Sequence, residues 1–253
     1  MSTWAALSDE LARWPEGRAT LWWRDDDAVA ASPALARLLS IARDVPVALA
    51  VIPAPLDDSL APAVADSNAA VLQHGYAHTN HAPPHAAKME LGPHRPFPHT
   101  LADMAQGWAR LEAAFGARAL PVMVPPWNRL APALIPLLPE IGFKGLSTYG
   151  VRARQEPVRG FVQANTHVDI VAWRGTRGFA GEDTVLGTLV KHLAARRMGE
   201  VPAEEPTGLL THHLVHDEAA WDFLARLVEC LHRHPGACWL GAASVFEPRG
   251  ARP

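Results

Sequence analysis

The chain has 253 residues, of which 49% are hydrophobic and 19% are charged, and its formal net charge is −3. A chain of this length and composition can bury the core of one large soluble domain, and the absence of a Lys/Arg-rich run excludes a typical nucleic-acid-binding surface. The N-terminus lacks the basic start and apolar core of a secretory signal, and no window approaches about 20 uninterrupted apolar residues, so we expect a cytoplasmic protein with no membrane partner.

Short apolar runs alternate with segments of helical period, starting with TLWW at 20–23 and a helix expected at 32–44. Helices are also expected at 100–116 and 217–236, and the later strand-like runs are VPVALAVIP, AAVLQ, ALPVMV, FKGLST, HVDIVAW, GLLTH and ACWLGA. This alternation predicts a parallel sheet. No Gly/Ser-rich linker divides the chain, so residues 1–253 are interpreted as one domain, a closed or nearly closed βα barrel. An open doubly wound sheet has similar local patterns and stays an alternative.

Two further features do not follow this alternation. The segment 81–99 is rich in Pro and His and has no periodicity, which predicts a long ordered loop at the rim of a barrel. Cys230 and Cys238 have neither the spacing of a metal knuckle nor the context of a secreted disulfide framework, so both are expected to be buried thiols.

Polar residues with catalytic or metal-binding chemistry directly follow the apolar runs. Residues 24–27 are Arg-Asp-Asp-Asp, His74 follows AVLQ, and His212 and His213 follow GLLT. In a parallel βα barrel these strand exits open on one face, where substrates bind. Three consecutive aspartates need either solvent or a cation, and His74 and His78 are one helical turn apart, so their side chains can face the same ion. An Asp-His-His metal site is the simpler explanation of both features.

Five motifs resemble, in order, those of the polysaccharide deacetylases, which remove acetyl groups from N-acetylated sugars. They are RDDD (24–27), HGYAH (74–78), VPPWN (124–128), VDIVAW (168–173) and LLTHH (209–213), and the resemblance spans about residues 20–245. It implies a distorted (β/α) barrel of about seven parallel strands with the active site at their C-terminal ends. It also implies a divalent metal, with zinc favoured, and a carbohydrate or other small-molecule substrate.

The resemblance also implies roles for individual residues. Counting back from Pro33 makes Asp25 the general base and Asp26 a metal ligand together with His74 and His78. Shifting the register by one makes Asp26 the base and Asp27 the ligand. The leucine-x-histidine spacing assigns the general acid to His212. The remaining motif residues are expected to contact the substrate or to support the site: Asp27, Pro126, Trp127, Asn128, Asp169, Trp173 and His213.

One departure from the family pattern is Val124, because the family commonly has an arginine here that orients the catalytic aspartate; Arg24 or Arg129 are possible substitutes. Two other hypotheses follow from the sequence. The first is that the chain is a catalytically inactive sugar-binding protein on the same fold. The second is that its histidines hold a structural zinc, although structural zinc usually has four protein ligands. Without a signal sequence, an intracellular sugar conjugate or a non-carbohydrate amide is a better substrate than a cell-wall polymer. The sequence does not define the oligomeric state.

Overall fold

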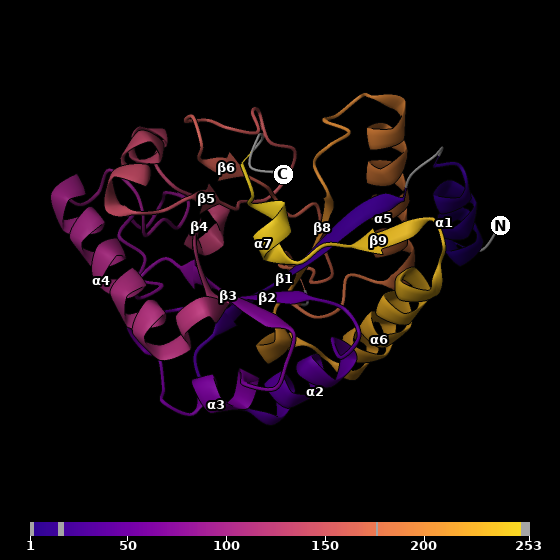
Figure 1. Ribbon diagram of the computed structural model, residues 1–253, viewed down its shortest axis with the longest axis horizontal. Helices are drawn as coiled ribbons and strands as arrows, with labels where there is room; N and C mark the ends of the chain where they lie inside the picture. Colours follow the sequence, from indigo (N-terminus) through magenta and orange to yellow (C-terminus); the bar gives the residue numbers. More distant parts are fainter. Residues whose placement is uncertain (1–2, 15–17, 176, 249–253) are drawn as a thin grey trace.

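The computed structural model describes residues 3–14, 18–175 and 177–248, and a parallel sheet forms its centre (Figure 1). The strands are β1 (Ala19–Ala28), β2 (Val47–Val51), β3 (Ala69–His74), β4 (Ala119–Val124), β5 (Gly145–Leu146), β6 (Val162–Gln163), β7 (Val168–Asp169), β8 (Thr207–Thr211) and β9 (Ala237–Trp239). Their order is β6-β5-β4-β3-β2-β1-β8-β7, with β9 paired to the start of β1. The sheet curls into a half-barrel with β6 and β7 at its edges, which confirms the distorted barrel.

Helices surround the outer face of this curled sheet, whereas α7 lies inside the curve (Figure 1). The α-helices are α1 (Thr3–Ala12), α2 (Pro33–Ile41), α3 (Leu60–Val64), α4 (Phe97–Phe115), α5 (Glu182–Met198), α6 (Glu218–Arg233) and α7 (Ala242–Val245). Short 3-10 helices are η1 (Gly116–Arg118), η2 (Pro126–Asn128), η3 (Pro132–Leu137), η4 (Pro139–Ile141) and η5 (His213–Val215).

Local sequence signals explain the ends of the predicted helices. The Ser32 hydroxyl accepts a hydrogen bond from the backbone N–H of Leu35 at the start of α2, and Asp217 caps α6 in the same way through Ala220. Helix α4 ends at Phe115 and is followed by Gly116, whose φ of 52° disfavours residues with a side chain. Strand β6 and helices α1, α3 and α5 were not among the expected elements.

Side chains of β1 alternate between the two faces of the sheet, as the pleat requires. Leu21 and Trp23 belong to the large apolar core between the sheet and the outer helices. Trp22 belongs to a smaller core on the concave face, where Val124 and residues of α7 also pack. Arg24 and Asp26 continue the concave-facing series, so the inside of the half-barrel becomes polar toward the C-terminal ends of its strands.

Strand β1 extends farther than the sequence predicted, because it includes the aspartate run instead of ending at Trp23. As a central strand it pairs with β2 on one side and β8 on the other, with Arg24 opposite Ala48 and Asp25 opposite Thr211. Buried charges are tolerated there because each carboxylate has a partner of complementary charge or hydrogen-bonding capacity.

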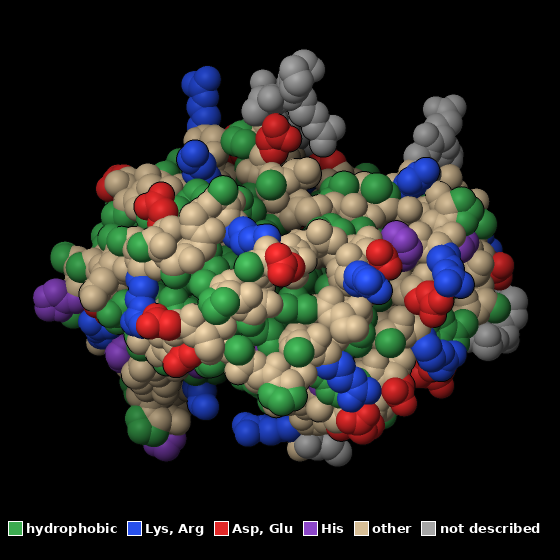
Figure 2. All heavy atoms as spheres, turned by 60° about the horizontal axis from the view of Figure 1, so that its bottom comes forward, with side chains coloured by type: hydrophobic (Ala, Val, Ile, Leu, Met, Phe, Trp, Pro, Cys, Tyr) green, Lys and Arg blue, Asp and Glu red, His purple; other side chains and the backbone are tan. Residues whose placement is uncertain are grey.

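Acidic and basic side chains are interspersed on the molecular face in Figure 2, without a concentrated basic patch. This distribution agrees with the near-neutral net charge of −3. Among the described helices, none combines the length and the hydrophobicity that crossing a bilayer would require.

Candidate metal centre and active site

Three metal-ligand side chains meet at the C-terminal ends of β1 and β3. Oδ1 of Asp27 lies 3.2 Å from Nε2 of His74 and 3.4 Å from Nε2 of His78. One ligand atom from each of the three residues falls within 4.8 Å of the others, and within the described part of the chain no other group of His, Cys, Asp and Glu does this. The geometry therefore brings together the two predicted histidines with one aspartate.

The donor set fits a divalent metal. Asp27 Oδ1 is buried and accepts no hydrogen bond with acceptable geometry, although two imidazoles face it. Nδ1 of His74 lies 3.0 Å from the carbonyl oxygen of Val124, which fixes this nitrogen as the protonated one and leaves Nε2 free to bind a cation. Burial raises the pKa of the Asp27 carboxyl, but the adjacent His74 outweighs it and holds that pKa below its usual range. Two imidazoles and a carboxylate form a donor set that zinc accepts.

The turn after β3 brings His78 back toward His74. The four-residue spacing brings both imidazoles to one point, as expected, but not through a helical turn: residues 75–78 form an irregular turn in which Gly75 has a φ of 56° and His78 a φ of 55°. A Cβ atom at Gly75 would overlap the Glu90 carboxylate and would lie 2.6 Å from Pro126. Glycine is therefore required here both by backbone conformation and by the lack of space.

The register of the aspartates differs by one residue from the one we favoured. Asp27, not Asp26, lies beside the histidines, because the pairing of β1 with β2 is irregular between Asp25 and Ala28 and Asp27 has a φ of 73°. This bulge gives Asp27 a direction that regular alternation does not provide. The alternative register, with Asp27 as ligand, is the one that the geometry fits.

Asp25, which the favoured register makes the general base, points away from the candidate metal site. It is fully buried, and its Oδ2 accepts hydrogen bonds from the Thr211 hydroxyl at 2.6 Å and from the backbone N–H of His213 at 3.0 Å. Its Oδ1 lies 2.5 Å from Nδ1 of His213. Because Asp25 and Asp26 are neighbours in a strand, their side chains lie on opposite faces, and only that of Asp26 faces the concave site.

Asp26 is held by Arg24, which lies two residues earlier on the same face. Nε of Arg24 donates to Oδ1 of Asp26 at 2.8 Å, and Nη2 donates to Oδ2 at 3.0 Å. The guanidinium is fixed in turn by the Ser147 hydroxyl at 2.7 Å and by Oδ1 of Asn128 at 2.7 Å. Arg24 is completely buried and Asp26 is 2% exposed, so this bidentate ion pair is strongly oriented.

His212 lies on the other side of Asp26, with its Nε2 3.9 Å from Oδ2 of Asp26. The Trp173 ring packs edge-to-face against the His212 imidazole, with 4.6 Å between ring centroids. Asp169, which was expected to contact the substrate or to support the site, accepts a hydrogen bond from Nε1 of Trp173 at 2.8 Å. Burial raises the pKa of Asp169, so this carboxyl is more readily protonated than an exposed one. Asp169 therefore acts on His212 indirectly, through the Trp173 ring and through an electrostatic interaction.

His213 faces the outer core, where Asp25 contacts it. Burial lowers the pKa of His213, but the negative charge of Asp25 and the hydrogen bond to it outweigh this effect and raise the pKa above the ordinary value. The two adjacent histidines thus have different surroundings: His212 faces Asp26, and His213 belongs to a buried ion pair.

The motif after β4 forms a wall beside His78. Trp127 lies over His78 with ring centroids 4.5 Å apart, and both Trp127 and Asn128 have positive φ values, 55° and 57°. Asn128 holds Arg24, and Pro126 lies against Gly75. Strained backbone at four positions around one site, including Asp27 and His78, is typical of functional sites.

Glu90 is a site residue that sequence reasoning missed. Its carboxylate accepts backbone N–H groups from the turn that carries the second histidine: Tyr76 at 3.1 Å, Ala77 at 2.8 Å and Thr79 at 3.4 Å. Glu90 is only 3% exposed although it comes from the Pro- and His-rich loop. No local pattern marks a carboxylate that binds the backbone of a distant turn. Ser147 and Thr211, which hold Arg24 and Asp25, were missed for the same reason.

No family model matches the chain, and no curated protein matches it in sequence. Solved structures do match it. A peptidoglycan N-acetylglucosamine deacetylase is 14% identical, with a TM-score of 0.59 over 92% of this chain and 90% of that one. A family 4 carbohydrate esterase from Streptomyces lividans, in complex with acetate, is 13% identical, with a TM-score of 0.56 over 92% and 97%. The third is a mutant of a family 4 (CE4) pseudoenzyme with restored activity, 14% identical, with a TM-score of 0.54 over 91% and 68%.

The chain has the fold of the CE4 polysaccharide deacetylases. Within this deacetylase fold, the half-barrel places the candidate Asp27-His74-His78 metal site at the C-terminal strand ends. Val124 ends β4 on the concave face, at the position where the resemblance implies an arginine, and Arg24 on β1 holds Asp26 instead.

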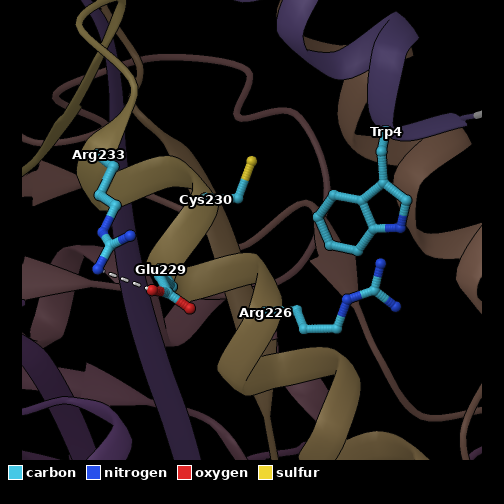
Figure 3. A pocket seen from close by; sticks show the side chains of 5 residues that line it. All are labelled: Trp4, Arg226, Glu229, Cys230 and Arg233. Carbon is cyan, nitrogen blue, oxygen red and sulfur yellow. Dashed lines mark ion pairs between the residues drawn. The ribbon is translucent and has the colours of Figure 1, made fainter.

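A hollow elsewhere on the deacetylase fold is unrelated to this site. Trp4 of α1 and four residues of α6 line a cavity of about 400 Å³ that includes Cys230 (Figure 3). Both of its arginines are paired with carboxylates, Arg226 with Glu182 at 3.1 Å and Arg233 with Glu229 at 3.0 Å. Its charges are thus neutralised within the protein, and it lies between outer helices.

Proposed function

We propose that this protein is a metal-dependent amide hydrolase that removes the acetyl group from an N-acetylated sugar or a related amide. One observation carries the proposal: Asp26 and His212 face each other, 3.9 Å apart, on the side of the half-barrel that also holds Asp27, His74 and His78. A base, an acid and a metal-ligand set on one face are the parts that hydrolysis of an unactivated amide requires.

Asp27, His74 and His78 would hold the metal, for which zinc is our proposal because of the mixed imidazole and carboxylate donors. When bound, a divalent ion supplies Lewis acidity toward the amide carbonyl and makes water more acidic. The residues of this chain then have to move the protons.

Asp26 is the proposed general base, which takes a proton from the attacking water. Arg24 fixes the direction of its carboxylate by two hydrogen bonds of 2.8 and 3.0 Å. A fixed carboxylate is an effective base because it needs no reorientation during proton transfer.

His212 is the proposed general acid. An amide nitrogen leaves as a neutral amine only if it receives a proton, and an imidazole can donate one near neutral pH. Trp173 packs against the His212 ring, and the backbone N–H of His212 donates to Nε2 of His216 at 3.3 Å. The Trp173 contact positions the imidazole, whose Nε2 lies 3.9 Å from Oδ2 of Asp26.

Two matched variants test this proposal. Asp27→Asn should remove most of the metal measured by elemental analysis, whereas Asp26→Asn should keep the metal and lose release of acetate from N-acetylated amines. Full metal content in Asp27→Asn would refute the ligand assignment. Unchanged turnover in Asp26→Asn would refute the base assignment.

A second candidate function rests on Val124. A CE4 pseudoenzyme exists among the structural matches, and absence of the expected arginine at position 124 favours a catalytically inactive sugar-binding protein. The Arg24–Asp26 pair counts against it, because it supplies the missing contact from another strand. Sugar binding by a metal-loaded protein that releases no acetate from any N-acetylated amine would support this second function.

A further inference from the structure

Exposed apolar side chains occur in the segments that follow the C-terminal strand ends, including the segment that contains His212. Six large hydrophobic residues are exposed among those the structure describes, and five of them follow the C-terminal ends of β5, β7 and β8. The sixth, Met198, ends α5. We call four of the five the apolar rim; they are 39 to 51% exposed and comprise Tyr149, Trp173, Leu214 and Val215. Exposed apolar groups beside a concave site commonly contact its ligand.

The polar atoms of the two aromatic rim residues are already bound within the protein. The Tyr149 hydroxyl donates to the carbonyl of His167 at 3.0 Å, and Nε1 of Trp173 donates to Asp169 at 2.8 Å. What these residues present to solvent is therefore their carbon faces. Leu214 and Val215 add only aliphatic groups. A ligand rich in hydroxyl groups would find few free hydrogen-bonding partners on this rim.

The opposite side of the site is more polar. Trp127 lies beside His78 with Nζ of Lys88 5.8 Å from its ring centroid, and Arg129 donates to the carbonyl of Lys88 at 3.3 Å. The two sides therefore offer different chemistry to the two halves of an amide.

His212 determines which half of the substrate meets the apolar rim. In the proposed hydrolysis water is consumed, a C–O bond forms, the C–N bond breaks, and the proton from His212 goes to the leaving nitrogen. That nitrogen must lie within reach of the imidazole, so the group attached to it lies near Trp173, which contacts His212 at 4.6 Å between centroids. Leu214 and Val215 follow in η5, where the Val215 N–H donates to the His212 carbonyl at 3.0 Å.

From these contacts we infer that the preferred substrates are acetylated amines whose amine-bearing half is apolar, such as an arylalkylamine, and not N-acetylated sugars. This inference rests on the proposed function. The rim then contributes binding energy by covering the apolar group, and the amine and acetate are the products.

The test compares N-acetylphenethylamine with N-acetylglucosamine as substrates of the metal-loaded protein. We expect kcat/KM to be at least roughly tenfold higher for the arylalkyl amide. Leu214→Ser should lower that value by roughly fivefold and change the value for the sugar less than about twofold. The matched control is Met198→Ser, because Met198 is 55% exposed but lies at the end of α5; it should change neither value.

Several outcomes would overturn the inference. A preference for the sugar, or equal effects of Leu214→Ser and Met198→Ser, would do so. So would sedimentation showing that the rim is buried in a dimer that Leu214→Ser dissociates. If neither amide is hydrolysed, the proposed function fails. Titration of the protein with phenethylamine then tests whether the apolar rim binds an apolar amine. Saturable binding that Leu214→Ser weakens would support the apolar binding site although the protein is not a hydrolase. Absence of binding would refute both the apolar site and the proposed function.

Discussion

Replacing Arg24 with methionine should remove the two hydrogen bonds that fix the direction of the Asp26 carboxylate. Arg24 is completely buried and donates two hydrogen bonds to Asp26, one to Ser147 and one to Asn128, all between 2.7 and 3.0 Å, with a longer one of 3.3 Å to the carbonyl of Thr148. Methionine keeps much of the volume but leaves the Asp26 carboxylate buried and unpaired.

The expected stability loss is large. Breaking a buried ion pair by removing one partner costs about 3–5 kcal/mol, a substantial part of the about 5–15 kcal/mol that stabilises a typical domain. The variant should therefore be assayed at low temperature, with its folded fraction measured. Per folded molecule, kcat for acetate release should fall by roughly 10²- to 10³-fold because a misdirected base is a poor one, whereas KM and metal content should change little.

A second arginine distinguishes this effect from simple destabilisation. Arg196 is equally buried, at 1% exposed, and binds Thr20, Ala203 and Thr207 away from the site. Arg196→Met should lower stability by a similar amount but leave kcat of the folded protein within about twofold of the parent.

Introducing an arginine at position 124, at the end of β4, provides a rescue experiment. Val124 packs in the same concave core as Trp22, on the face that carries Arg24 and Asp26. The double variant Arg24→Met/Val124→Arg should therefore recover at least roughly tenfold in kcat over Arg24→Met alone. The reasoning is refuted if Arg24→Met keeps kcat within threefold of the parent, or if Arg196→Met loses as much.

Three further predictions concern the acid, the turn and a remote histidine. His212→Ala should keep the metal and lower kcat by roughly 10²- to 10⁴-fold. His213→Ala should mainly lower stability, because it leaves Asp25 buried without its partner. Equal losses of kcat in the two variants would show that the two histidines act as a unit. Gly75→Ala should lower metal content as well as stability, because the added Cβ displaces Glu90 or Pro126; full metal content would show that the turn tolerates the change. Burial, together with the charges of His167 and Arg196, lowers the pKa of His192 to about 3. The unfolded chain therefore binds a proton near pH 6.5 that the folded protein does not, so stability falls as the pH drops from about 6.5 toward 4. His192→Gln should show a smaller fall in urea unfolding free energy between pH 7 and pH 5, and an equal fall would contradict this cause.

Much of the fold was predictable because its signals are local. The runs at 45–53, 69–73 and 119–124 became β2, β3 and β4, since continuous apolar segments between turn signals suit strands covered on both faces. The caps at Ser32 and Asp217 act within three residues, so the starts of α2 and α6 could be predicted from the sequence alone.

Which aspartate belongs to the candidate metal site depended on tertiary structure. Three consecutive aspartates are chemically equivalent in the sequence, and only the pleat of β1 and its bulge direct Asp25 outward, Asp26 inward and Asp27 toward the histidines. The spacing of His74 and His78 predicted that they share a site, but the conformation that joins them, an irregular turn held by Glu90, was not predictable from the sequence.

The sequence by itself determined the order of the strands along the chain, the two histidines of the candidate metal site and the convergence of polar residues at the strand ends. Tertiary structure decided which distant partners each buried charge has: Ser147 and Asn128 for Arg24, His213 for Asp25, and the 75–79 turn for Glu90. The physical reason is distance along the chain. A strand or a cap is stabilised by neighbours a few residues away, whereas a buried charge is stabilised by groups that are close only after the sheet has curled.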